Sequence, residues 1–230
     1  MKRLVLPRLY VILDAALLTV PETECAQKLA AAGVRLLQYR NKRASARELF
    51  ESSKELSSLL IPQDVTFVLN DRADVASAAE ANGVHVGQED LRAEAARSVI
   101  GTGKLLGVST HNLDQFRDAA ATSADYVAVG PVFSTSTKAN PDPVIGIEFI
   151  RRVRGLTDKP IVAIGGSGSS GPLKSFKRAL IPLQSSVISS SRAIPDSGRG
   201  NISNFWEPRT IRLPSEAPPN GRHDARHPTK

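Results

Sequence analysis

Cationic and hydroxyl side chains follow the short apolar runs of this sequence, and their residue types are those that bind phosphate. The cations are Arg40, Lys42 and Lys138, which can pair with phosphate oxygens in charge-assisted hydrogen bonds. The loop that contains Lys138 also carries Thr135 and Thr137, whose hydroxyls can donate further hydrogen bonds. Each residue alone would also suit a solvated surface. Together they predict a site for a phosphorylated ligand.

Two carboxylates follow neighbouring apolar runs in the same way. They are Asp71, in the segment LND, and Asp90, in the segment GQED. Either could cap the next helix, but hard oxygen ligands beside phosphate-binding cations are typical of Mg²⁺ held partly by substrate oxygens. Gly165 and Gly166 follow a later run and allow the backbone to approach an anion closely. The sequence therefore predicts a diphosphate ligand, with Mg²⁺ as the cofactor.

The elements that must position these residues alternate between short β-branched apolar runs and amphipathic stretches of about 10 to 16 residues, which is typical of parallel βα units. The expected strands cover residues 9–14, 34–40, 66–71, 83–87, 105–110, 126–132 and 160–166. The expected helices cover residues 22–33, 46–60, 73–83, 92–101, 113–124 and 146–157.

Such a series fits either an open doubly wound sheet or a (β/α)8 barrel that ends after its seventh strand. A barrel collects its chemistry at the C-terminal ends of many strands, whereas a doubly wound sheet concentrates it at one switch point. Here nearly every expected strand runs into polar residues, and no dinucleotide glycine fingerprint follows the first one. We therefore expect an α/β fold, a (β/α)8 TIM barrel over residues 1–166 that is incomplete after the seventh strand.

Six motifs occur in a fixed order along this region: QYRNK, LND, GVHVGQED, GVST, GPVFSTSTK and AIGG. In that order, over residues 9–166, the sequence resembles the thiamine phosphate synthase family. The resemblance implies a transferase that joins hydroxymethylpyrimidine diphosphate to a thiazole phosphate and releases diphosphate. It also implies Mg²⁺ as cofactor and small molecules as partners.

The resemblance assigns a role to each motif residue. It implies that the pyrimidine diphosphate is held by Gln38, Arg40, Lys42, Asn70, Ser109 and Lys138. It implies that the thiazole phosphate is held by Thr135, Thr137 and Gly166, and Mg²⁺ by Asp71 and Asp90. Tyr39, Asn41 and Ser136 are expected as further substrate-binding residues. The expected catalytic residues are Arg40, Ser109 and Lys138, which act by positioning and electrostatics because no protein nucleophile is required. His85 either touches the site or is an inward barrel histidine satisfied by its neighbours.

Residues 167–230 differ from the rest in composition. They hold 10 Lys and Arg against 4 Asp and Glu, so most of the net charge of +7 lies there, and we expect a disordered tail. The family would continue after AIGG with a helix, an eighth strand and a small-residue turn, but here Pro182 interrupts the apolar run. Permitted codons for residues 172–191, read two nucleotides later, give those elements in order. We hypothesise a frameshift near Ser167.

Composition also limits the classes of function. The longest apolar stretches fall short of the roughly 20 residues that cross a bilayer, and a single Cys25 fits a reducing compartment, so we expect a cytoplasmic protein without a membrane partner. Two alternatives stay open: a basic tail that binds nucleic acid, and a related barrel that isomerises the thiazole phosphate or only binds thiamine phosphates. The presence of QYRNK with Asp71 and Asp90 favours the synthase and no nucleic-acid partner.

Overall fold

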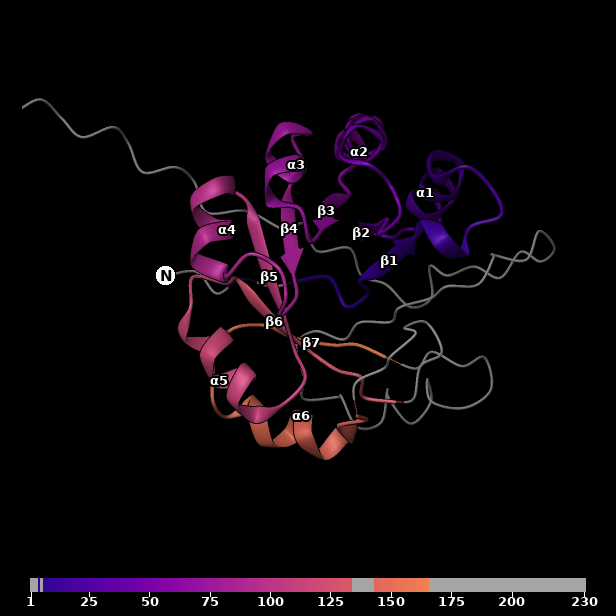
Figure 1. The fold of residues 1–230 in the computed structure, drawn as a ribbon. Helices are drawn as coiled ribbons and strands as arrows, with labels where there is room; N and C mark the ends of the chain where they lie inside the picture. Colours follow the sequence, from indigo (N-terminus) through magenta and orange to yellow (C-terminus); the bar gives the residue numbers. More distant parts are fainter. Residues whose placement is uncertain (1–3, 5, 134–142, 166–230) are drawn as a thin grey trace, which may run out of the picture.

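The computed structural model of this 230-residue chain describes residues 4, 6–133 and 143–165, in which strands and helices alternate (Figure 1). The strands are β1 (Val11–Asp14), β2 (Leu36–Arg40), β3 (Thr66–Asn70), β4 (Gly83–Val86), β5 (Leu105–Thr110), β6 (Tyr126–Val129) and β7 (Ile161–Ala163). The α-helices are α1 (Glu22–Ala31), α2 (Ala46–Leu60), α3 (Ala73–Ala78), α4 (Ala93–Ile100), α5 (Leu113–Ala121) and α6 (Gly146–Arg154). Two short 3₁₀ helices are η1 (Ala15–Leu17) and η2 (Ile61–Gln63).

The seven strands form one parallel sheet, in which each strand pairs with the next one along the chain. Figure 1 shows that the sheet curls and that the helices form an arc along its outer side. This arrangement confirms the expected α/β barrel. Among the described residues, β1 and β7 are the two edges of the sheet and do not pair with each other, so the barrel is incomplete.

Every expected strand and helix is present, and the differences are confined to their ends. β6 stops before the expected end at residue 132, because Pro131 has no backbone N–H to continue the ladder. β7 is also shorter than expected, and the following Gly165 has a left-handed backbone with a φ of 113°. A Cβ on Gly165 would lie 2.8 Å from the Cα of Pro131. A glycine is therefore required where these two backbone segments meet.

Apolar side chains fill both faces of the sheet, as expected for parallel strands that are covered on both sides. The outer face packs against the helices. The inner face holds a smaller cluster made of Leu6, Tyr10, Leu36, Val68, Leu105, Tyr126, Ala128 and Val162. Side chains alternate along a strand, so Gln38 and Arg40 lie on the inner face of β2 with Leu36. Tyr39, between them, packs in the outer cluster.

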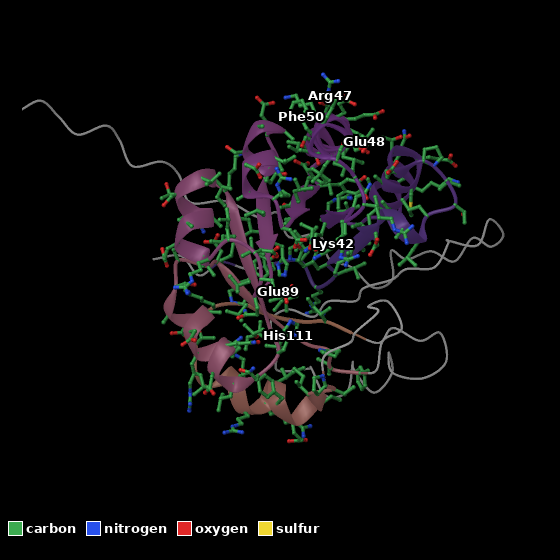
Figure 2. All side chains as sticks on the ribbon, viewed as in Figure 1. Lys42, Arg47, Glu48, Phe50, Glu89 and His111 are labelled. Carbon is green, nitrogen blue, oxygen red and sulfur yellow. The ribbon has the colours of Figure 1, made fainter. Side chains whose placement is uncertain are left out.

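Among the described α-helices, α2 and α5 begin at a residue whose side chain caps the helix. At the start of α2, the Ser45 hydroxyl accepts from the Glu48 backbone N–H at 3.3 Å, and the Glu48 carboxylate accepts from the Ser45 N–H at 2.8 Å. Figure 2 shows Glu48 with Arg47 and Phe50 on α2, at the outside of the molecule. None of the described helices has the length and apolar character needed to cross a membrane.

Gly83 allows β4 and β5 to approach each other at the start of their pairing. A Cβ on Gly83 would lie 2.3 Å from the carbonyl oxygen of Leu105 and 2.7 Å from its Cβ. Because the first of these atoms is backbone, no rotamer change removes the clash. We expect Gly83→Ala to lower the free energy of unfolding by about 2 kcal/mol or more in urea denaturation. Gly103→Ala is the control, since nothing lies within 4 Å of a Cβ there; equal midpoints for the two variants would contradict this packing.

Candidate active site

The C-terminal ends of the parallel strands meet at one end of the curled sheet. Arg40 ends β2, Asn70 ends β3, and Ser109 lies near the end of β5. Figure 2 shows Lys42, from the loop after β2, and His111, which follows β5, toward the middle of the curl. We call this end the rim, and the predicted site residues described on it are Arg40, Lys42, Asn70, Asp71, Asp90 and Ser109. The fold thus brings together residues that are distant in sequence.

Arg40 is held at the rim by a buried carboxylate. Asp14 ends β1, and its register partner on β2 is Arg40. The Arg40 guanidinium donates to one Asp14 oxygen, and the other Asp14 oxygen accepts from the Ala16 N–H at 3.1 Å. Asp14 is 5% exposed, whereas the Arg40 side chain is 24% exposed. The carboxylate therefore orients the guanidinium and leaves part of it accessible to an anion.

Asp71 and Asp90 lie together beside Lys42. Asp71 follows β3 with a left-handed φ of 67°, and its N–H donates to the His85 carbonyl oxygen at 2.7 Å. Burial raises the pKa of the Asp71 carboxyl, and the adjacent Asp90 raises it further, while Lys42, whose Nζ is 2.9 Å away, lowers it. Asp90 accepts from the Gly87 N–H at 2.7 Å. The two carboxyls are thus fixed close enough to repel each other when both are ionised.

This carboxyl pair fits a divalent cation, because a cation beside two carboxylates offsets their mutual repulsion. Mg²⁺ in particular is bound through one or two carboxylates and completes its shell with water and phosphate oxygens. Within residues 4, 6–133 and 143–165, no group of three or more His, Cys, Asp or Glu side chains could hold a metal ion. The chemistry of these two carboxylates fits Mg²⁺.

A row of hydrogen-bonded side chains crosses the inside of the curl below the rim. Gln38 Nε2 donates to the Tyr10 hydroxyl at 2.8 Å, and that hydroxyl lies 2.9 Å from the Tyr126 hydroxyl. The Tyr126 hydroxyl is 2.9 Å from His85 Nδ1, and His85 Nε2 is 2.7 Å from Ser109 Oγ. Burial lowers the pKa of His85 to about 4, so its ring is neutral near pH 7. His85 is thus an inward histidine satisfied by its neighbours, one of which is a predicted site residue.

Two predicted substrate-binding side chains point away from the rim. Tyr39 faces the helices, and its hydroxyl donates to the Glu22 carboxylate of α1 at 3.0 Å. Asn41 donates to the Tyr39 hydroxyl at 3.2 Å, and its Oδ1 accepts from the backbone N–H groups of Arg43 and Ala44, each at 3.1 Å. For Tyr39, the reason is the alternation of side chains along β2. These two side chains brace the loop after β2 and are not brought to the other site residues.

The rest of the predicted site lies outside the described residues. This applies to Thr135, Ser136, Thr137, Lys138 and Gly166. It applies equally to the predicted disordered tail, residues 167–230. Their assignments stay predictions from the sequence.

Several side chains that build the rim carry no motif signal. Asp14 is visible in sequence only as a charge at the end of the first apolar run. Tyr10 and Tyr126 look like ordinary core aromatics, and they meet across 116 residues of chain. Gln88, by contrast, lies in the motif GVHVGQED and donates to the Ser109 carbonyl oxygen at 2.6 Å, a contact that links the loop after β4 to β5. Tyr10 and Tyr126 are brought together by the curl of the sheet.

Comparisons with known proteins point to one family. The Thiamine monophosphate synthase family profile matches residues 9–171. A thiamine-phosphate synthase from Koribacter versatilis is 52% identical over 168 residues, which cover 70% of this chain and 78% of the relative. A thiamine-phosphate synthase from Chloroflexus aurantiacus is 44% identical over 160 residues, which cover 69% of this chain and 74% of the relative.

A solved structure agrees with these sequence relatives. The thiamine phosphate pyrophosphorylase from Pyrococcus furiosus superposes with a TM-score of 0.68 at 33% sequence identity. The match covers 80% of this chain and 85% of that one. The similarity therefore extends from the sequence motifs to the arrangement of the strands and helices that carry them.

Proposed function

This chain belongs to the thiamine monophosphate synthase family, and we infer that it is a thiamine-phosphate synthase, a transferase that acts on small molecules. It joins hydroxymethylpyrimidine diphosphate to a thiazole phosphate and yields thiamine phosphate and diphosphate. The observation that supports this most strongly is the rim, where Lys42 lies beside the carboxyls of Asp71 and Asp90, and Arg40 is held by Asp14 at the end of β2. The same rim lies within the region that matches the family.

The reaction requires charge stabilisation and positioning rather than a protein nucleophile. The C–O bond between the pyrimidine methylene carbon and the diphosphate breaks, and the diphosphate leaves with the bonding electrons. The thiazole nitrogen then gives its electron pair to that carbon and forms the new C–N bond. Negative charge grows on the departing diphosphate, so fixed cations near it lower the barrier. Orientation of the nitrogen toward the carbon lowers it further.

We assign the diphosphate to the cationic side of the rim. Arg40 is pre-oriented by buried Asp14, and Lys42 is 2.9 Å from Asp71. Both can donate to phosphate oxygens in charge-assisted hydrogen bonds. Lys138 is a third cation assigned to this half by sequence. Together these groups would neutralise the leaving group as it separates.

We assign Mg²⁺ to Asp71 and Asp90. Their proximity raises the pKa of Asp71 and makes a bound cation favourable there. When bound, Mg²⁺ supplies positive charge to the diphosphate oxygens. Lys42 lies beside Asp71 and can contact the same phosphate group. A tautomerase that acts only on the thiazole phosphate would not need this carboxyl pair, so the pair favours the synthase.

The thiazole phosphate is assigned to Thr135, Ser136, Thr137 and Gly166, which follow the sixth and seventh strands. In barrels of this kind, phosphate sites are frequently formed by the loops after strands seven and eight.

We also propose that the protein works in the cytoplasm. A single cysteine, Cys25, which lies in α1, is consistent with a reducing compartment.

Calorimetric titration with the pyrimidine diphosphate and Mg²⁺ tests the diphosphate assignment. We expect Arg40→Ala to weaken binding by about 1.5 to 3 kcal/mol, the range for a hydrogen bond to a charged group. Because this change also leaves Asp14 buried without its cation, the double variant Asp14→Asn/Arg40→Ala should bind as weakly and unfold cooperatively. Arg43→Ala is the control, since Arg43 is exposed in the same loop. Unchanged affinity in Arg40→Ala would contradict the assignment.

A further inference from the structure

The buried row Gln38, Tyr10, Tyr126, His85 and Ser109 connects two residues assigned to the substrate. Its members come from β2, β4, β5 and β6 and from the residue before β1. The four residues from Gln38 to His85 are at most 4% exposed. Inside such a site, each polar hydrogen needs an acceptor. Each hydrogen of the row can therefore be assigned to one acceptor.

At one end of the row, Gln38 Nε2 can only donate. The Tyr10 oxygen accepts that bond, so the single Tyr10 hydrogen must go to its other partner, the Tyr126 oxygen. Within the described residues, the Tyr10 hydroxyl has only these two partners. The Tyr126 hydrogen then points to its remaining partner. The reverse order would leave the Tyr10 hydrogen without an acceptor.

The same hydrogen-bond order fixes the tautomer of His85. Its Nδ1 accepts from Tyr126 and so carries no hydrogen, which places the ring hydrogen on Nε2, from where it is donated to Ser109 Oγ. Ser109 Oγ is thus an acceptor within the row. Its own hydrogen is left for a partner outside the row. At the other end, Gln38 keeps its carbonyl oxygen, which can only accept, and the second hydrogen of Nε2.

We propose that Tyr10, Tyr126 and His85 are positioning residues whose hydrogen-bond order makes Ser109 a donor toward the substrate and leaves the Gln38 carbonyl oxygen to accept from it. This inference rests on the proposed function, because it takes both ends of the row as substrate contacts. The substrate that fits offers an acceptor atom to Ser109 and can offer a donor hydrogen to the Gln38 carbonyl oxygen. A molecule that offers no acceptor to Ser109 would leave the Ser109 hydrogen without a partner.

Packing holds the row in register. The Tyr126 ring stacks on His85 with centroids 5.6 Å apart and meets the Tyr10 ring edge to face at 5.9 Å. Gly107 makes room for Tyr126, since a Cβ there would lie 2.0 Å from Cζ and 2.2 Å from the hydroxyl oxygen. The hydroxyls therefore have little freedom to change partners.

The first test is the tautomer, which is independent of any substrate. In the full chain labelled with nitrogen-15 histidine, the His85 signal is assigned as the one missing from His85→Gln. We expect its spectrum to show a hydrogen on Nε2 and none on Nδ1. A hydrogen on Nδ1 would overturn the proposal even if the chain binds its substrates.

The second test is a double-mutant cycle on the affinity for the pyrimidine diphosphate, measured by calorimetry with Mg²⁺. We expect Tyr126→Phe to weaken binding roughly five- to tenfold, but to have almost no further effect once Ser109→Ala has removed the end of the row. A merely structural role of Tyr126 would give additive losses, and additive losses would overturn the proposal.

Two further variants keep the cycle decisive. Tyr10→Phe breaks the row one bond further from Ser109 and replaces Tyr126→Phe if that variant does not unfold cooperatively. Thr110→Val is the matched control, because it removes a different buried hydroxyl from β5, one that donates to the Ala128 carbonyl oxygen. We expect Thr110→Val to leave the affinity unchanged, both in the otherwise unmodified chain and in the Ser109→Ala chain.

If the unmodified chain does not bind the pyrimidine diphosphate, the proposed function fails, and the tautomer result stands separately.

Discussion

Asp71→Asn should reduce turnover by roughly 100-fold or more, which corresponds to about 2.7 kcal/mol of lost transition-state stabilisation. The substitution removes one of the two carboxylates assigned to Mg²⁺. Asparagine has nearly the same shape and tolerates the left-handed backbone at this position better than alanine does. The change also relieves repulsion with Asp90, so thermal unfolding should stay close to that of the unmodified chain.

The measurement is initial rate against Mg²⁺ concentration, with both substrates saturating. Asp71→Asn should need much more Mg²⁺ for half-maximal rate, in addition to its lower maximum. Asp74→Asn is the control, because Asp74 lies only three residues further along, is exposed and pairs with Arg72. An unchanged Mg²⁺ requirement in Asp71→Asn would remove this residue from the metal site.

A chain with the reading frame restored after Ser167 should turn over faster than the 230-residue chain, by a factor on the order of 100. In the described residues, β1 and β7 are the edges of an incomplete barrel. Unpaired edges leave backbone groups and apolar faces uncovered that closure of a barrel would bury. The loop after an eighth strand would also add to the phosphate site. We therefore propose that the tail limits activity and stability.

The two chains are compared side by side in thermal unfolding and in turnover. The restored chain should melt at a higher temperature. Its turnover should also fall less than that of the 230-residue chain when the concentration of thiazole phosphate is lowered. Equal melting temperatures and equal turnover would show that residues 167–230 already provide what the eighth unit provides. Sequencing of the DNA around Ser167 decides independently whether the frame is altered.

The strands and helices could be predicted because their signals are local. A run such as that of β2 is apolar enough to be buried, and its alternation places Gln38 and Arg40 on the inner face. The same alternation places Tyr39 outside, so its substrate role, implied by family resemblance, was open to question from the pattern alone. The placement of Asp71 at the rim is predicted by its position directly after a strand.

The hydrogen-bond partners could not be predicted, because they depend on the register of the strands and on the curl of the sheet. The buried pairing of Asp14 with Arg40 needs the register of β1 on β2. The contact of Tyr10 with Tyr126 needs a curl that brings the beginning and the end of the barrel wall together. Neither distance is encoded in a motif. The sequence indicates which residues face inward, and the three-dimensional fold decides which of them meet.

The most direct test of the account is to detect thiamine phosphate itself. The 230-residue chain and its frame-restored form are each incubated with hydroxymethylpyrimidine diphosphate, the thiazole phosphate and Mg²⁺, and the products are separated and quantified. The account predicts equal amounts of thiamine phosphate and diphosphate, faster with the restored chain, and nearly none when Mg²⁺ is chelated or Asp71 is replaced by Asn. Absence of thiamine phosphate from a cooperatively folded, frame-restored chain would contradict it.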